Sequence, residues 1–81
     1  MHEFSLAQGL HDQLIDLAIE HKVSKILKAE VGVGSNAGIV KDSFTFGFNV
    51  LLTQNEITQG MELVIENNSG DDLILLRVEM E

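Results

Sequence analysis

The sequence predicts a small single α+β domain spanning residues 1–81, and three observations support this class. The chain has 81 residues, of which 44% are hydrophobic, enough for one core and too few for two. An apolar period of 3.6 residues runs through its first quarter, and a two-residue alternation appears in later segments. Neither Cys nor Pro occurs, so no disulfide framework is expected and glycines mark the turns.

The first expected element is an amphipathic helix at the start of the chain. Ser5 followed by Gln8 matches a capping box, which predicts that the helix begins at Ser5. The period predicts a helix of about sixteen residues whose apolar stripe shares one face. The stripe consists of Leu6, Leu10, Leu14, Leu17, Ala18 and His21.

Three later segments alternate as half-buried strands do. The first covers residues 25–33, and a glycine-rich turn follows at 34–38. The apolar positions of the three strands are Leu27, Ala29, Val31 and Val33, then Met61, Leu63 and Ile65, then Ile74, Leu76, Val78 and Met80. Residues 67–72 are expected to form a hairpin loop that makes the last two strands antiparallel neighbours, because a parallel pair needs a longer crossover. An outward Leu75 is expected on the last strand.

The segment at residues 43–52 fits two patterns. Its phenylalanines alternate with Thr45 and Gly47, which favours a strand. Phe44, Phe48 and Leu52 also lie on one helical face, which Asp42 or Ser43 could cap. The pattern alone leaves both alternatives open.

The charge is strongly acidic and unevenly distributed. The net charge is −8: residues 1–41 carry four Lys against five acids, and residues 42–81 carry Arg77 against eight. This field repels phosphate, so no nucleic-acid partner is expected. It suits a metal cation or a basic protein, although acids also simply keep a protein soluble. No stretch approaches the length of a bilayer span, so we expect no membrane partner and a cytoplasmic location.

Met1, His2 and Glu3 are the candidate metal ligands. An N-terminal amine, the His2 amide nitrogen and its imidazole can form fused chelate rings around one ion. A planar set of nitrogen donors suits Ni(II) or Cu(II) better than Zn(II), and Glu3 can add a carboxylate. A His at position two is more often a terminal residue without such a role.

The opening M-H-E-F-S resembles the M-H-E-x-S opening of the hydrogenase and urease nickel-incorporation proteins, the HypA/HybF family. Further segments resemble the family in order along the chain: V-G-V-G at 31–34, G-I-V-K-D-S-F-T-F-G-F at 38–48, G-M-E-L-V-I at 60–65 and L-L-R-V-E-M at 75–80. The resemblance implies element order α-β-α-β-β, with a three-stranded mixed sheet packed by two helices. It also implies that residues 43–54 are helical.

The same resemblance implies a function that is not enzymatic. In the family, nickel binds at the N-terminus through the residues that match His2 and Glu3. The metal is then handed on, with a partner GTPase, to a nickel-enzyme subunit such as that of hydrogenase or urease.

The sequence departs from the family at the zinc module. Family members carry two C-x-x-C knuckles between their last two strands, where this chain has only residues 67–72 and no Cys. Ligand chemistry therefore predicts no zinc. The alternative function is that of a paralogue acting as a protein-interaction module without metal delivery. A monomer or weak dimer is expected, since acidic residues oppose pairing at an exposed strand edge.

His11 and His21 are not expected to bind metal. Ten residues of helix separate them by about 15 Å, too far to share one ion. His11 lies at the edge of the apolar stripe, which favours a packed or solvated side chain.

Overall fold

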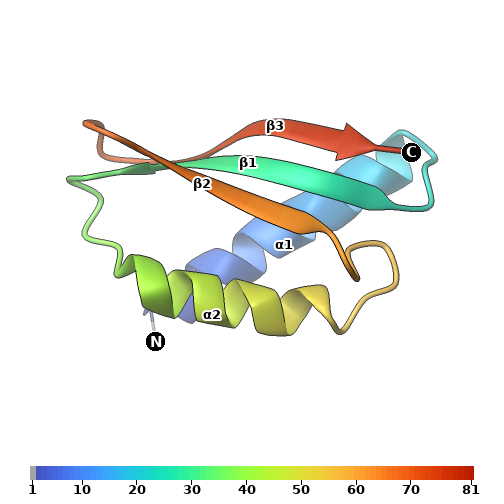
Figure 1. The fold of residues 1–81 in the computed structure, drawn as a ribbon, viewed down its shortest axis with the longest axis horizontal. Helices are drawn as coiled ribbons and strands as arrows, with labels where there is room; N and C mark the ends of the chain where they lie inside the picture. Colours follow the sequence, from blue (N-terminus) through green and yellow to red (C-terminus); the bar gives the residue numbers. More distant parts are fainter. Residues whose placement is uncertain (1) are drawn as a thin grey trace.

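The structure is a computed structural model that describes residues 2–81 and the side chains of residues 3–81. Two helices and three strands follow in the order α-β-α-β-β, as the resemblance implied (Figure 1). They are α1 (His2–Glu20), β1 (Ile26–Gly34), α2 (Lys41–Leu52), β2 (Glu62–Asn68) and β3 (Leu73–Met80). None of the helices in residues 2–81 is both long and apolar enough to cross a bilayer.

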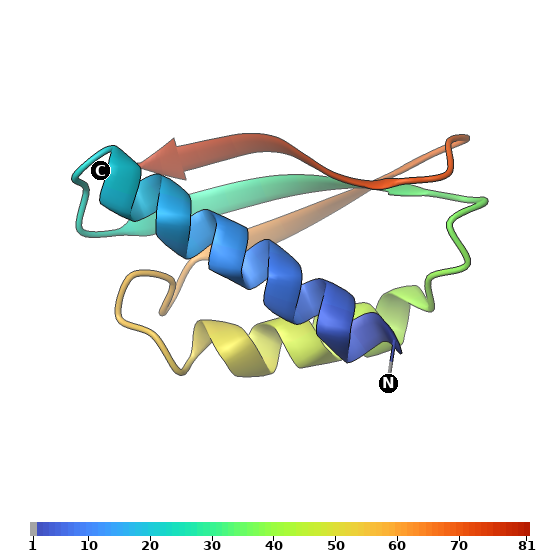
Figure 2. The same cartoon turned by 180° about the vertical axis from the view of Figure 1, so that it is seen from behind.

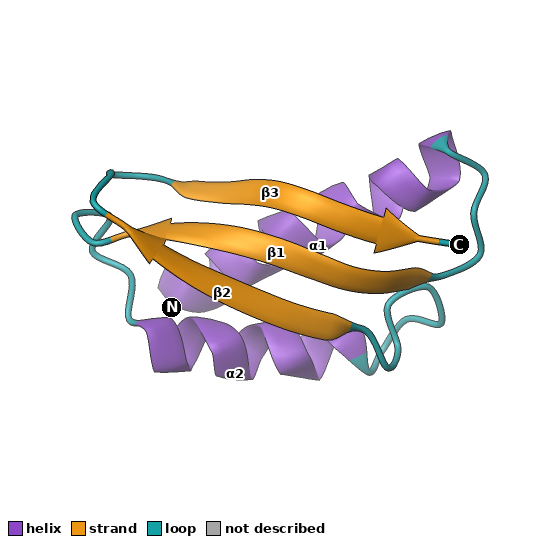
Figure 3. Ribbon diagram, turned by 45° about the horizontal axis from the view of Figure 1, so that its top comes forward, coloured by secondary structure: helices purple, strands orange, loops and turns teal. Residues whose placement is uncertain are grey.

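The strands form one mixed sheet with β1 in the centre. Their order is β2-β1-β3; β1 runs parallel to β2 and antiparallel to β3. Both helices cover the same face, and within residues 2–81 no helix lies on the other face (Figures 1 and 3). The predicted α+β class with a three-stranded mixed sheet is confirmed.

The expected hairpin between the last two strands is wrong. β2 and β3 run in opposite directions, but β1 lies between them, so residues 69–72 cross from one sheet edge to the other. This connection packs on the end of β1, where the Gly34 amide donates to the Asp72 carbonyl at 2.9 Å and Ser35 N donates to Asn68 O at 2.8 Å. The short connection correctly predicted that β2 and β3 run in opposite directions. It did not show that the two strands are adjacent, and β1 lies between them.

The segment at residues 43–52 is helical, so the strand pattern was misleading. Phe44 and Phe48 are fully buried, with stacked rings whose centroids lie 5.8 Å apart. Phe46 points the other way and is 73% exposed. The N-cap is Val40, without a side-chain cap, so neither Asp42 nor Ser43 caps the helix. One turn brings Phe44 and Phe48 onto the same face, and their burial stabilises the helix more than its weak propensity opposes it.

Helix α1 begins at His2, three residues before the expected cap. Ser5 therefore lies inside the helix and is not its N-cap. The helix ends in a Schellman arrangement, in which Val23 N donates to Ala18 O and Lys22 N donates to Ile19 O. Lys22 supplies the left-handed residue, with φ of 56°, where glycine is usual.

Bulges change which side chains of β1 and β3 face the helices. The β3 register passes from Val31↔Leu75 to Glu30↔Arg77, so Leu76 is an extra residue. Leu73 and Leu75 face the core before it, and Val78 and Met80 do so after it. The expected outward Leu75 is thus wrong, and Ile74 and Leu76 face solvent instead. A second irregularity beside Leu27 leaves that residue exposed and Ile26 buried.

The core lies between the sheet and the two helices. It combines residues of α1 with the inward residues of β1 and the buried face of α2. Leu6, Leu10, Leu14 and Ala18 of the predicted stripe contribute to it, but Leu17 does not and His21 is exposed. Its buried hydrophobic members are Ala7, Leu10, Leu14, Ala18, Ile26, Ala29, Val31, Val33, Phe44, Phe48, Leu52 and Met61. Helix α1 crosses beneath the sheet and starts beside the start of α2 (Figure 2). Both helix N-termini therefore lie at the same end of the molecule.

Candidate metal centre

The candidate site lies at this shared end, on the first turn of α1. Met1 lies outside the described residues, and His2 is the first residue of α1, described by its backbone alone. An amide in the first turn of a helix makes no hydrogen bond to a carbonyl four residues earlier. The His2 amide nitrogen is consequently not held by the helical hydrogen-bond ladder.

Glu3 connects the first turn of α1 to the start of α2. Its Oε2 accepts a hydrogen bond from the Val40 amide at 3.2 Å. Because Val40 is the N-cap of α2, the Glu3 carboxylate lies at the positive end of that helix dipole. Asp42, in the first turn of α2, adds a second carboxylate at the same helix end.

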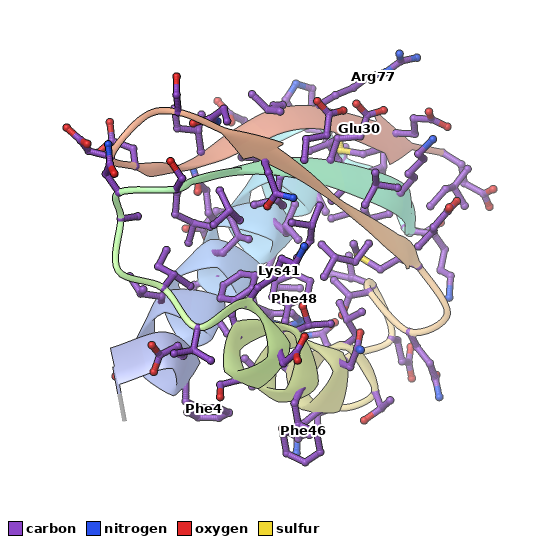
Figure 4. All side chains as sticks on the ribbon, turned by 60° about the vertical axis from the view of Figure 1, so that its left-hand side comes forward. Phe4, Glu30, Lys41, Phe46, Phe48 and Arg77 are labelled. Carbon is purple, nitrogen blue, oxygen red and sulfur yellow. The ribbon has the colours of Figure 1, made fainter. Side chains whose placement is uncertain are left out.

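A groove runs beside this turn on the outer side of the helices. Its volume is about 560 Å³, and its lining residues are Glu3, Phe4, Asp42, Ser43, Phe46, Gly47 and Val50. Phe4 and Phe46 project from the side of the helices that faces away from the sheet (Figure 4). Gly47 allows Phe4 to approach, because a Cβ there would lie 2.9 Å from a Phe4 ring carbon.

The other two histidines lie away from the groove. His11 is 7% exposed, and its Nε2 makes a hydrogen bond with the Thr58 hydroxyl. Burial lowers the pKa of His11 below its usual value of 6.5, and the nearby Asp12 carboxylate opposes this effect. His21 Nδ1 donates to Leu17 O at 2.9 Å within its own helix. Neither imidazole is directed to the first turn of α1.

Side chains alone do not make a metal cluster in the part of the chain whose side chains are described. Across residues 3–81, no group of three or more His, Asp or Glu side chains is placed to hold an ion. The site expected from the sequence is of another kind, since it uses main-chain nitrogens together with the His2 imidazole.

Sequence reasoning missed the groove and the contact between Glu3 and Val40. The spacing of the sequence could have predicted one wall of the groove. Asp42, Phe46 and Val50 are four residues apart and therefore share one face of a helix. Once residues 43–52 are helical, Phe46 must face away from Phe44 and Phe48. No local pattern could have predicted the hydrogen bond between Glu3 and Val40, because these residues are 37 positions apart in the sequence.

Relatives of this chain are hydrogenase maturation factors. The chain is 42% identical over 66 residues to the hydrogenase maturation factor HypA of Caldanaerobacter subterraneus subsp. tengcongensis, covering 82% of this chain and 57% of the relative. It is 39% identical over 67 residues to HypA of Psychromonas ingrahamii, covering 83% and 58%. The chain thus spans somewhat more than half the length of these relatives.

Solved HypA structures share the fold. The solution structure of the Ni metallochaperone HypA from Helicobacter pylori superposes with a TM-score of 0.84 at 17% identity, over 96% of each chain. A second HypA solution structure gives 0.82 at 19% identity, over 100% of this chain and 97% of the other. The family model described as "Hydrogenase/urease nickel incorporation, metallochaperone, hypA" matches residues 1–71. A match over this much of the chain shows that it belongs to the HypA family, whose members are metallochaperones and not enzymes.

Proposed function

We propose that this chain binds Ni(II) at its N-terminus and passes it on during maturation of a nickel enzyme such as hydrogenase or urease. The Met1 amine, the His2 amide nitrogen and the His2 imidazole form the planar donor set, and Glu3 supplies a further donor. The observation that carries the proposal is the family match, which begins at residue 1 and includes M-H-E. Nitrogen donors in a plane are the set that Ni(II) favours.

The geometry at the helix start supports this assignment. The His2 amide lies in the first turn of α1, where no helical hydrogen bond competes with a metal. Glu3 lies one residue further along the same turn, and its Oε2 accepts a hydrogen bond from Val40 N at 3.2 Å. That contact fixes where the carboxylate lies relative to α2.

The proposed form of the protein carries nickel and no zinc. Residues 69–72 connect β2 to β3, and no Cys is present in the sequence to form a thiolate site. Partners of the proposed pathway are a maturation GTPase and a nickel-enzyme subunit, acting in the cytoplasm. A second candidate function is a protein-interaction module without metal delivery, which the short connection favours.

Calorimetry with Ni(II) on the untagged chain tests the proposal. His2→Ala should abolish tight binding, and a tag ahead of Met1 should weaken it by removing the amine. His21→Ala is the matched control, since that side chain bonds within its own helix. Affinity should rise from pH 6 to pH 8, because the amine and the imidazole must lose protons to bind.

Each outcome has a clear meaning. Loss of binding in His2→Ala with binding retained in His21→Ala supports the site. Equal affinity in the two variants contradicts it. An untagged chain that binds no nickel favours the interaction module.

A further inference from the structure

The groove beside the first turn of α1 gathers several exposed large apolar side chains. Phe46 is 73% exposed, Phe4 41% and Val50 37%, and all three line the same hollow. Single exposed apolar residues are ordinary, but a contiguous group of them marks an interaction surface. Two of the three are phenylalanines, and aromatic residues are enriched at protein interfaces.

The two walls of the groove come from different helices and meet at Gly47. Its Cα lies so close to the Phe4 ring that an added Cβ would be 2.9 Å from a ring carbon. The volume of about 560 Å³ falls within the usual range of binding pockets, roughly 300–1,000 Å³. A hollow of this size has room for bulky apolar side chains.

The charged residues that line the groove are acidic, and this bears on the charge of its partner. Glu3 and Asp42 line it, and no Lys or Arg does. Lys41 lies on the sheet side of α2, opposite Phe46 (Figure 4). A second copy of this chain, at net charge −8, would bring further acidic groups to the same place. Electrostatic complementarity therefore favours a cationic partner.

We propose that this groove binds an amphipathic helix of another protein. Its apolar residues, spaced i and i+4, fill the space between Phe4 and Phe46, and its flanking Lys or Arg residues face Glu3 and Asp42. The proposal goes beyond nickel binding and does not depend on His2. Phe46, which no part of the nickel proposal uses, is its central contact.

A pair of synthetic helical peptides tests the proposal. Both carry leucines at i, i+4 and i+7; one has flanking lysines and the other has glutamates at the same positions. Each is titrated into the ¹⁵N-labelled full chain while amide shifts are followed. We expect the lysine peptide to shift the amides of Phe46, Gly47 and Val50. We expect its affinity to exceed that of the glutamate peptide by about tenfold or more and to fall as salt is added.

Variants distinguish binding in the groove from non-specific binding to exposed apolar residues. Phe46→Ser should lower the affinity for the lysine peptide by about tenfold or more. Asp42→Asn should lower this affinity less, and it should also reduce the salt dependence of binding. Ile19→Ser is the matched control, because Ile19 is another exposed apolar residue on a helix, 65% exposed, that does not line the groove. Circular dichroism confirms that each variant is folded.

Several results would overturn the proposal. They are equal binding of the two peptides, shifts confined to the sheet, and Phe46→Ser binding as tightly as the wild type. Self-association that Phe46→Ser abolishes would assign the groove to a second copy instead. Nickel calorimetry on Phe46→Ser should match the wild type, so a failure of this proposal is distinguishable from a failure of the nickel site.

Discussion

His11 and Thr58 form a buried hydrogen bond, with the imidazole Nε2 2.9 Å from the hydroxyl oxygen. The Thr58 hydroxyl also lies 3.2 Å from the Leu52 carbonyl, to which it donates. Because the hydroxyl proton is donated to Leu52, the Thr58 oxygen acts as acceptor toward His11, whose Nε2–H is the donor. This pair joins α1 to the segment between α2 and β2.

Thr58→Val should lower the free energy of unfolding by about 1–3 kcal/mol, because it leaves a buried imidazole N–H without an acceptor. Thr53→Val is the control, since its hydroxyl donates to Val50 O at an exposed position. Urea denaturation of the two variants measures the difference. Equal losses would show that the bond to His11 contributes nothing specific.

Stability should depend on pH through His11. Burial lowers its pKa in the folded state, so the unfolded chain binds a proton more tightly. The contribution of His11 is fully present above about pH 6.5 and is lost as the pH falls toward the lower folded-state value. His11→Gln should flatten the change in unfolding free energy between pH 7.5 and 5.5, as measured by chemical denaturation at the two pH values. An unchanged slope in His11→Gln would contradict this origin.

Two glycines should respond to alanine with opposite signs. A Cβ at Gly34 would lie 2.5 Å from the Gly70 carbonyl carbon and would clash with the backbone there. Gly34→Ala should therefore lower the free energy of unfolding by about 1–3 kcal/mol. A Cβ at Gly9, within α1, would meet nothing within 4 Å, so Gly9→Ala should raise the free energy of unfolding by about 0.5–1 kcal/mol. Thermal denaturation of both variants checks the signs. A neutral Gly34→Ala would mean that residues 69–72 shift freely.

The end of α1 offers a stabilising change. Lys22 adopts a left-handed conformation that costs a residue with a Cβ about 1–2 kcal/mol. Lys22→Gly relieves that strain but makes the unfolded chain more flexible, so we expect a net gain of about 0.5–1 kcal/mol. Glu20→Gly, in the last turn of the helix, should lose about the same amount. Chemical denaturation distinguishes the two, and a loss in Lys22→Gly would contradict the strain.

Self-association should be weak and should strengthen with salt. β3 lies at a sheet edge with Ile74 and Leu76 exposed, and residues 42–81 carry eight acids against one Arg. Added salt shortens the Debye length below its physiological value of about 8 Å and so screens this repulsion. Sedimentation of micromolar protein at low and high salt measures it. A tight dimer indifferent to salt would show that apolar burial dominates.

The sequence predicted elements wherever local periodicity coincided with the final packing. The repeat of Leu6, Leu10, Leu14 and Ala18 identified α1, because these side chains face the core. At Phe44, Phe46 and Phe48 two periods fitted the same residues, and only the family resemblance favoured a helix. On β3, an extra residue at Leu76 reversed the alternation, which composition alone does not reveal. The contact of Glu3 with Val40 depends on how two helices pack, so neither segment predicts it by itself.

The central position of β1 makes the connection between β2 and β3 a natural point of insertion. The two strands stand two sheet spacings apart, roughly 10 Å, so the chain must span that gap whatever its length. None of the ladder hydrogen bonds of the sheet joins β2 to β3, and a longer excursion there would leave both registers with β1 intact. The same scaffold can therefore be closed by residues 69–72 or can carry an independently folded unit at that end without a change of topology.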